Sequence, residues 1–285
     1  MKVTVTTVYD RITNPGIFAF LSHGLSFYIG SEKDKIMFDL GLLGGMLMKN
    51  MGTLGISANT ITKIVFSHGH SDHTGGLNAF LAHRTKKTVI PIYMHPKALE
   101  PKRAHIGKLR LWDTGMYQIE PALERKIKFI FSREPIVINS FLMTTGEISL
   151  ENRTFIQNVS KYYVHFCDSK WSVDPVIDEV SLILKTKEGL VLICGCCHSG
   201  LSNTIRKAET LVNDKVLTVI GGVHLTGARR KKILEIADEL DQNYTDIAYF
   251  FNHSIGKLAF KTLRKRLGET RVNYAPFGKT FIFDC

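Results

Sequence analysis

The chain has 285 residues, of which 44% are apolar and 22% are charged. These proportions fit a globular protein of one large or two small α/β domains with a sizeable core. No stretch approaches the roughly 18 consecutive apolar residues of a membrane span, and the alternating N-terminus lacks the apolar segment of a signal peptide. We therefore expect a cytoplasmic protein without a membrane partner.

The first half of the chain predicts strands from runs rich in β-branched and aromatic residues, at 2–9, 24–30, 34–41, 63–67 and 89–96. A helix is expected over 74–84, with Thr74 as a candidate N-cap and one apolar face. A stretch rich in glycine and methionine, 41–55, separates two of the strands. Residues 97–150 form an irregular excursion with short strand-like segments at 109–115, 126–132 and 141–149.

The second half alternates strands and helices more regularly. EVSLILKT and GLVLICGC predict a hairpin around Lys187–Gly189. Further strands are expected at 216–225 and 247–254, and helices at 202–212, 228–240 and 257–268. This order indicates an α/β protein in which two sheets pack together with helices outside, and we expect a single domain over 1–285.

The five cysteines lie at positions 167, 194, 196, 197 and 285. Three of them fall within ICGCC, too close together for a spaced disulfide framework, and the total is odd. Reduced thiols in a cytosolic protein account for this pattern.

The formal net charge is +11, and much of it lies in RRKK (229–232) and KTLRKRLG (261–268). We expect both segments to be solvent-exposed helix faces. The excess of positive charge can also attract an anionic molecule toward a cleft. A small phosphorylated substrate ranks ahead of nucleic acid, because no DNA- or RNA-binding motif accompanies the charge. The sequence does not predict the oligomeric state.

The stretch IVFSHGHSDHTGGL (64–77) places three histidines and an aspartate within six positions. His68 and His70 are two residues apart on extended chain, so both project beyond the end of the 63–67 strand. Asp72 and His73 begin the next helix, where adjacent side chains diverge and can face a second centre. Imidazole and carboxylate together suit zinc or another borderline divalent metal, whereas the alternative is a polar loop with local hydrogen bonds.

H-x-H-x-D-H after an apolar strand, followed by two glycines and a helix, resembles the metallo-β-lactamase superfamily. The resemblance implies an αββα sandwich of two mixed sheets with helices outside. It also implies that His68 and His70 serve one metal and Asp72 with His73 a second. A narrower likeness is to the subgroup of the archaeal dihydropterin–ribofuranosylaminobenzene phosphate synthase and many bacterial metal-dependent hydrolases, carried by the blocks HGLSFYIG, IMFDLG, DPVIDEVSLIL, GLVLICGCCHSGLSNT, IGGVHLTGA and NHSIGKLA.

The same resemblance implies further metal ligands at the ends of later strands. His198 follows GLVLICGC, and His253 follows IAYFFN at the position of the distal histidine. His224, in IGGVHLTG, is a candidate ligand, proton donor or phosphate contact. Asp39, at the end of IMFD, is expected to orient the ligand loop through hydrogen bonds. The remaining histidines are expected to have surface or structural roles: His23, His83, His95, His105 and His165.

The chain departs from the superfamily pattern at two places. CGCCH stands where most members carry a bridging aspartate, so Cys196 occupies that position, and either its thiolate or His198 would replace the carboxylate. The histidine of the third motif is missing, and DPVIDE offers Asp174, Asp178 and Glu179 in its place. The site is therefore expected to hold one or two divalent ions, most readily zinc.

A metal site of this kind predicts a hydrolase, because a divalent metal lowers the pKa of bound water to about 7. Asp72 could orient that water or relay a proton. The leading hypothesis is a metal-dependent hydrolase acting on a small phosphorylated substrate. The alternatives are the condensing chemistry of the synthase relatives and a ligand-binding sensor that uses the fold without turnover.

Overall fold

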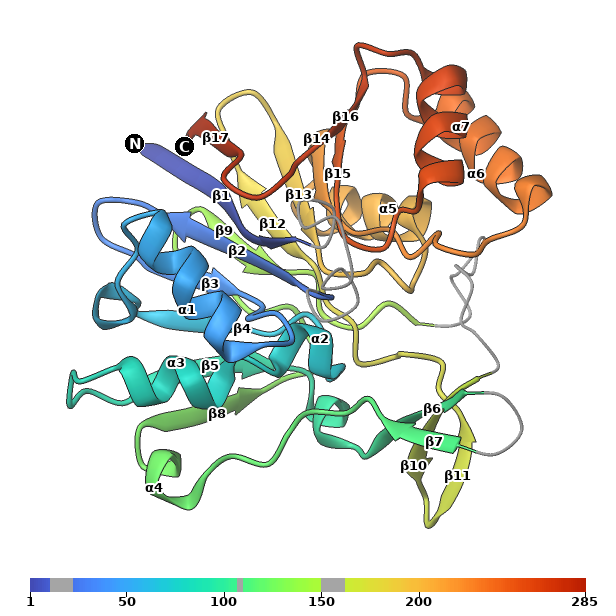
Figure 1. The fold of residues 1–285 in the computed structure, drawn as a ribbon. Helices are drawn as coiled ribbons and strands as arrows, with labels where there is room; N and C mark the ends of the chain where they lie inside the picture. The colour runs from blue at the N-terminus through green and yellow to red at the C-terminus, as the bar shows by residue number, and fades with distance from the viewer. Residues whose placement is uncertain (11–22, 107–109, 150–161) are drawn as a thin grey trace. The chain divides into compact units, whose positions relative to one another are not determined.

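The computed structural model describes residues 1–10, 23–106, 110–149 and 162–285 (Figure 1). The chain divides into two compact units. The first unit comprises Met1–Arg133, Val159–Asp178 and Pro276–Phe283, and the second comprises Glu134–Asn158, Glu179–Ala275 and Asp284–Cys285.

The first unit is built on a seven-stranded mixed sheet in the order β17-β1-β2-β3-β4-β5-β8. Strands β1 to β3 pair antiparallel, and β3, β4, β5 and β8 pair parallel. The bounds are β1 Lys2–Asp10, β2 Leu25–Gly30, β3 Lys35–Phe38, β4 Lys63–Val65, β5 Ile90–Met94, β8 Ile127–Phe131 and β17 Thr280–Asp284.

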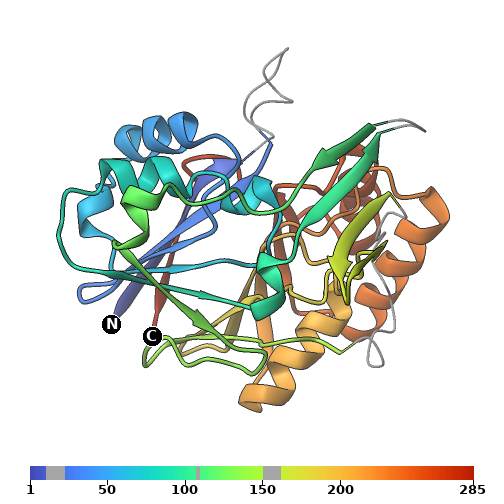
Figure 2. The same ribbon diagram turned by 90° about the horizontal axis from the view of Figure 1, so that it is seen from below.

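Helices α1 (Gly44–Thr53) and α3 (Leu77–His83) lie together on one face of this sheet (Figure 2). Leu47 and Phe80 of these helices share one apolar cluster with Ile64 and Ile92 of the strands beneath. The shorter helices of the unit are α2 Ser71–Thr74, α4 Pro121–Glu124, η3 Ala58–Thr60 and η4 Pro96–Leu99. Burial of these aliphatic side chains is what holds the helices to the sheet.

A second, antiparallel sheet of four strands also belongs to the first unit, in the order β11-β10-β6-β7. Its strands are β6 Lys102–Ile106, β7 Arg110–Asp113, β10 Tyr163–Cys167 and β11 Lys170–Val173. Segments some sixty residues apart in the sequence are thus paired within one sheet.

The second unit contains a six-stranded mixed sheet in the order β16-β15-β14-β13-β12-β9. Neighbours from β13 to β16 are parallel, and β9, β12 and β13 pair antiparallel. Three helices pack on it through a common apolar cluster. The bounds are β9 Leu142–Thr144, β12 Leu182–Lys185, β13 Leu190–Cys194, β14 Val216–Gly221, β15 Ala248–Phe251, β16 Val272–Tyr274, α5 Leu201–Val212, α6 Arg230–Asn243 and α7 Lys257–Leu267.

The predicted strands and the hairpin around Lys187–Gly189 are confirmed, as are the helices α5, α6 and α7. The strand-like segments within 97–150 correspond to β7, β8 and β9. Helix α1 was not predicted, because its glycines lower helix propensity. Its apolar face consists of the buried residues Leu47 and Met51, which is a weak helical pattern in the sequence.

The helix predicted over 74–84 is confirmed for Leu77–His83, with its apolar face buried, but its predicted start is wrong. The chain forms the short helix α2 and then α3, with Gly75 and Gly76 between them. Thr74 does not cap the second helix: its hydroxyl donates to the carbonyl of His70, and the N-cap residue is Gly76. As a result, Asp72 and His73 of the histidine motif lie together on the single turn of α2, directly after His70.

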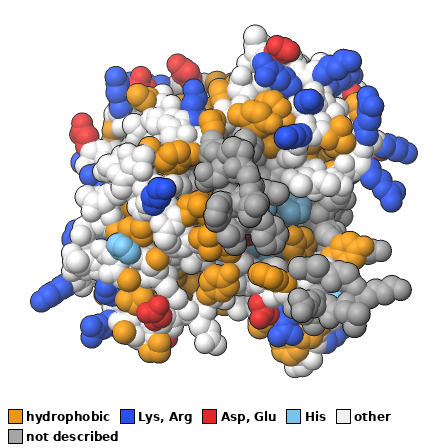
Figure 3. Space-filling model, viewed as in Figure 1, with side chains coloured by type: hydrophobic (Ala, Val, Ile, Leu, Met, Phe, Trp, Pro, Cys, Tyr) orange, Lys and Arg blue, Asp and Glu red, His pale blue; other side chains and the backbone are white. Residues whose placement is uncertain are grey.

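Most lysines and arginines of the two basic segments are exposed, as expected, whereas Leu263 and Leu267 of the second segment are buried. Lysine and arginine side chains gather over α6 and α7, at the upper right of Figure 3. None of the helices in the described part of the chain combines the length and the apolar composition that crossing a bilayer requires.

Candidate metal centre

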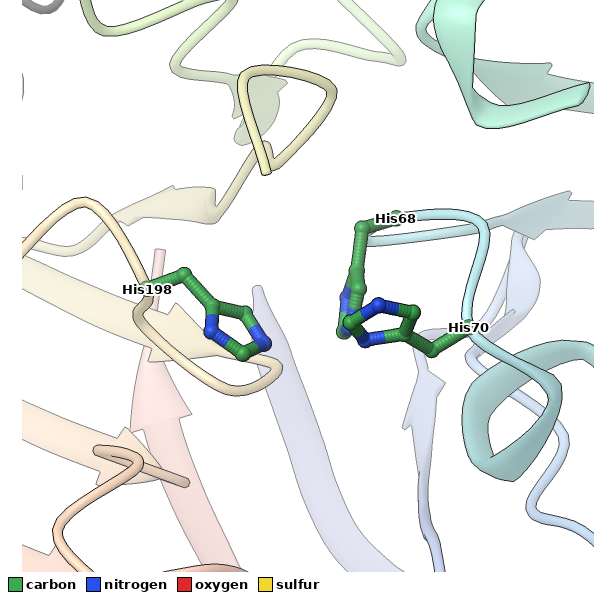
Figure 4. Close-up of side chains that lie close together, drawn as sticks. All are labelled: His68, His70 and His198. Atoms are coloured by element: carbon green, nitrogen blue, oxygen red, sulfur yellow. The ribbon is translucent and has the colours of Figure 1, made fainter. Parts of the chain in front are cut away.

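His68 and His70 lie next to each other on the loop that follows β4 (Figure 4). Nε2 of His68 is 2.9 Å from Nδ1 of His70, and both side chains are buried. Two nitrogens bound to one tetrahedral zinc ion are about 3.3 Å apart, given a zinc–nitrogen bond of about 2.0–2.1 Å. The two imidazoles therefore already stand at nearly the spacing that a shared metal requires.

Gly69, between the two histidines, allows the loop to pass close to the backbone of η4. A Cβ atom at this position would lie 2.0 Å from the carbonyl oxygen of Ala98, closer than any real contact. The Gly69 amide donates to the Asp178 carboxylate at 2.8 Å. The loop is thus pressed against the backbone of η4 on one side and hydrogen-bonded on the other.

Asp39, directly after β3, anchors the start of the loop. Its Oδ1 accepts the Ser67 amide at 2.7 Å, and its Oδ2 accepts from the Ser67 hydroxyl at 2.7 Å and from Nδ1 of His73 at 2.6 Å. Asp39 is fully buried and has a φ of 61°, a left-handed conformation that costs energy for a residue other than glycine.

These hydrogen bonds determine which ring nitrogens carry protons. A carboxylate accepts only, so Nδ1 of His73 is the donor, and in the neutral imidazole the lone pair then lies on Nε2. Since the Ser67 hydroxyl donates to Asp39, its oxygen accepts from Nδ1 of His68, 2.9 Å away, which leaves Nε2 of His68 with a lone pair. The neutral form of imidazole, with a lone pair on one ring nitrogen, is the form that binds a metal.

His70 is also favoured in its neutral form. Burial lowers its pKa and the nearby Lys102 ammonium lowers it further, whereas the carboxylates of Asp174, Asp72 and Asp178 oppose the shift. A neutral imidazole is available to a metal over a wider range of pH.

Asp72 and His73 lie on α2, and a residue from outside the motif joins them. Oδ2 of Asp72 is 3.7 Å from Nε2 of His73 and 3.1 Å from Nε2 of His23. His23 was expected to have only a surface or structural role. The sequence feature that could have indicated a role for His23 at the site is its position as the first residue of the HGLSFYIG block.

The second unit brings together Cys196, His198 and His224, which offer ligand atoms within 4.8 Å of one another. They lie on the turns after the neighbouring parallel strands β13 and β14, whose ends meet at one edge of the sheet. Figure 4 includes His198 at its turn after β13. The rings of His198 and His224 stand 4.2 Å apart, and Cys196 and His198 are buried.

These turns are held in strained conformations by short polar contacts. Cys197, His224 and Ser254 have φ angles of 56°, 42° and 64°. The Ser254 hydroxyl accepts the amide of His224 at 3.0 Å and lies 3.6 Å from Sγ of Cys196. Backbone strain of this kind persists only where the surroundings enforce it, and it is frequent at functional sites.

His253 immediately precedes Ser254 and follows β15, and its side chain is fully buried. Gly222, at the end of the neighbouring strand, has no room for a side chain: a Cβ there would lie 2.2 Å from the carbonyl oxygen of Gly195 and 2.7 Å from that of His253. The turns that carry Cys196, His224 and His253 therefore pack closely within the second unit.

The acidic residues of DPVIDE are engaged by protein groups. Asp174 and Asp178 both pair with Lys102, and Glu179 accepts the amide of Ser199 at 2.8 Å. None of the three belongs to a metal-binding group among the described residues.

A separate group in the first unit consists of Glu100, His165 and Cys167, with ligand atoms within 4.8 Å of one another. Nδ1 of His165 lies 2.9 Å from the Glu100 carboxylate. The ammonium of Lys97 lies 3.7 Å from the sulfur of Cys167 and 3.8 Å from the Glu100 carboxylate. This group therefore already has a positive charge beside its donor atoms.

Imidazole, thiolate and carboxylate donors at these spacings fit a divalent metal of the zinc type. In the first unit the donors are His68 and His70, with Asp72 and His73 beside them. In the second unit they are Cys196, His198 and His224. The donor chemistry agrees with either one or two ions.

A sequence model described as the metallo-beta-lactamase superfamily matches residues 20–147. The chain is 31% identical over 219 residues to the 7,8-dihydropterin-6-methyl-4-(beta-D-ribofuranosyl)-aminobenzene-5'-phosphate synthase of Methanocaldococcus jannaschii, covering 74% of each chain. The chain belongs to the metallo-beta-lactamase superfamily.

Solved structures of the superfamily share the fold. The crystal structure of Tm1679, a metal-dependent hydrolase of the beta-lactamase superfamily, matches with a TM-score of 0.73 and 22% identity over 98% of both chains. The metallo-beta-lactamase fold protein YhfI from Bacillus subtilis matches with a TM-score of 0.60 and 14% identity, covering 99% of this chain and 100% of YhfI. The predicted metallo-β-lactamase fold is thus confirmed.

Proposed function

We propose that the protein is a metal-dependent hydrolase that activates water at a histidine and aspartate metal centre and acts on a small phosphorylated substrate. The observation that supports it best is the pair of imidazole nitrogens of His68 and His70, which are 2.9 Å apart. Asp39 anchors the loop that carries them through hydrogen bonds from Ser67 and His73. The proposed ligands are His68, His70, Asp72, His73, His198 and His253, and the proposed ion is zinc.

A bound divalent metal supplies Lewis acidity and brings the pKa of a water molecule close to neutrality. The chain's own residues provide the rest. Asp72, whose side chain is 17% exposed and lies 3.1 Å from His23, can orient a water and pass a proton to that imidazole. His224, half-buried on its strained turn, is proposed as the group that donates a proton to the leaving group.

The substrate class is proposed from charge. The net charge of +11 attracts anions to the protein and raises their local concentration. A phosphate group suits such a surface and also suits a divalent metal. We propose a small-molecule substrate rather than nucleic acid.

The second candidate is a condensing synthase, and the specific support for it is the 31% identity to the archaeal synthase. In that reaction the C–O bond that links the diphosphate to the pterin compound would break. The aromatic acceptor would bond to the same carbon, and pyrophosphate would leave. The acceptor would give up one proton in exchange. The same carboxylate and imidazole groups could take that proton.

One preparation tests both candidates. The protein is purified without added metal, its metal content is measured, and it is assayed with phosphomonoesters, phosphodiesters and a pterin diphosphate plus an aromatic acceptor. The hydrolase proposal expects bound divalent metal and phosphoester cleavage that a chelator abolishes. A condensation product without phosphoester cleavage would favour the synthase, and metal binding without any turnover would favour a ligand-binding sensor.

We also propose a cytoplasmic location. Among the described residues the five cysteines are thiols and not disulfides, including the neighbours Cys194, Cys196 and Cys197. Free thiols in such number are typical of a reducing compartment.

A further inference from the structure

A lysine and two aspartates form a buried cluster in the first unit. Nζ of Lys102, on β6, lies 2.9 Å from Oδ2 of Asp174 and 3.0 Å from Oδ1 of Asp178. Each of the three side chains is only 1% exposed. Charged groups this deep in a protein are kept only when they are paired and hydrogen-bonded.

Two members of the cluster, Lys102 and Asp174, have pKa values shifted in the direction that favours their charged forms. Burial by itself would lower the pKa of Lys102, but Asp178 and Asp174 more than reverse this and raise it above its ordinary value. Burial would raise the pKa of Asp174, but Lys102 and His70 lower it overall. The two hydrogen bonds therefore commit one oxygen of each carboxylate to the lysine.

The cluster contacts the histidine loop at two adjacent residues. Oδ2 of Asp178 accepts the backbone amide of Gly69 at 2.8 Å. Oδ2 of Asp174 faces Nε2 of His70 at 3.9 Å, on the far side of the ring from Nδ1, which meets His68. The carboxylates thus approach the backbone before His70 and the outer edge of its ring.

Lys102 also reaches the loop through its backbone. Its carbonyl oxygen accepts the amides of Thr114 and Gly115 at 2.9 and 3.2 Å, and the carbonyl oxygen of Thr114 accepts the amide of Ser71 at 2.7 Å. His70 is therefore flanked by Gly69 and Ser71, and the amides of both are held by groups tied to Lys102.

We propose that Lys102, Asp174 and Asp178 form a positioning cluster that holds the His68–Gly69–His70 segment in its metal-binding geometry. This inference rests on the proposed function, because it assumes that His68 and His70 bind a divalent metal. The cluster acts through Gly69 and His70, and its two aspartates are not metal ligands.

The competing explanation gives Asp174 or Asp178 the role of the histidine missing from the third motif. The two explanations predict opposite effects when the lysine is removed. Freed carboxylates beside His70 would bind metal more tightly if they were ligands. If the cluster positions the loop, loss of Lys102 leaves two unpaired buried charges, disorders the loop and weakens metal binding.

The test compares Lys102→Met with wild type and with Lys126→Met as a matched control. Lys126 is a partly buried lysine whose ammonium donates to the carbonyls of Leu81 and Arg84, away from the loop. Zinc affinity is measured by competition with a chromophoric chelator, and urea unfolding of the metal-free proteins is measured in parallel. We expect Lys102→Met to lose about 10–100-fold in zinc affinity, as partners of metal ligands do.

The control separates positioning from general instability. Lys126→Met should lower the unfolding midpoint of the metal-free protein yet keep zinc affinity within about twofold of wild type, since it touches no group of the loop. Unchanged or tighter zinc binding by Lys102→Met, or an additional bound ion, would overturn the inference. If Lys102→Met does not fold, Lys102→Gln, which keeps a donor for the aspartates, serves for the same comparison.

The two proposals fail in different ways. A wild-type protein that binds no divalent metal contradicts the proposed function and removes the basis of the positioning role. A wild-type protein that binds zinc with an affinity indifferent to Lys102 contradicts the positioning role alone.

Discussion

The Asp39 carboxylate accepts a hydrogen bond from Nδ1 of His73 at 2.6 Å, and both side chains are fully buried. The two residues are 34 positions apart, at the ends of different elements. The same carboxylate receives the amide and hydroxyl of Ser67, so one acidic group orders the residues at both ends of the histidine motif. It leaves the Nε2 atoms of His68 and His73 as acceptors, which is what metal ligation requires.

Replacing Asp39 by Asn should weaken zinc binding by about 10–100-fold. Asn tolerates the left-handed backbone conformation at this position, so the main chain should persist. Its amide NH2, however, would face the donors Nδ1 of His73 and Oγ of Ser67 and favour the wrong imidazole tautomer. Chelator competition measures the affinity. Asp34→Asn, which alters a carboxylate paired with Lys63, is the control, and equal affinities for the two variants would refute this role.

Replacing His68 and His70 by Ala should remove metal from the first unit, because both nitrogens of the pair are lost. Elemental analysis of the purified double variant checks this expectation. His83→Ala is the matched control, since His83 is exposed and its Nδ1 lies 2.8 Å from the carbonyl oxygen of Ala79, one turn earlier in the same helix. Full metal retention by the double variant would exclude these residues as ligands.

Two glycine replacements should change stability in opposite directions. Gly69→Ala places a methyl group 2.0 Å from the Ala98 carbonyl oxygen and should destabilise the protein by about 1–3 kcal/mol through overpacking. Gly52→Ala, in α1 with open space around the new Cβ, should stabilise it by about 0.5–1 kcal/mol because alanine loses less entropy in a helix. Urea unfolding of the metal-free proteins measures both, and equal midpoints would contradict the packing at Gly69.

Replacing Cys196 by Ser tests whether its thiolate is a ligand. If it is, the variant should bind less zinc, because a hydroxyl is a much poorer ligand than a thiolate. The cobalt-substituted wild type should also show sulfur-to-metal charge-transfer absorption that the variant lacks. Cys285→Ser, at the chain's last residue, is the control. Unchanged stoichiometry and spectrum would assign the position to His198.

Much of the site could be predicted from local pattern alone. The H-x-H-x-D-H spacing after a buried strand indicates a metal site because alternate residues of extended chain point the same way. The strand-end positions of His198, His224 and His253 could be predicted for a different reason, since an apolar run ends where its strand leaves the core of the sheet. The contact between Asp72 and His23 could not, since it joins residues on separate elements.

The sequence by itself determined the superfamily, the strands of the sheets and the candidate donor residues, because these depend on short-range periodicity and on residue type. Only the tertiary structure decided which groups the carboxylates of Asp174 and Asp178 contact. Asp174 and Asp178 resemble spare metal ligands in the sequence, yet they are held by Lys102, which lies more than seventy residues away. Pairing between distant buried charges depends on how the sheets bring their strands together, and no local pattern encodes that.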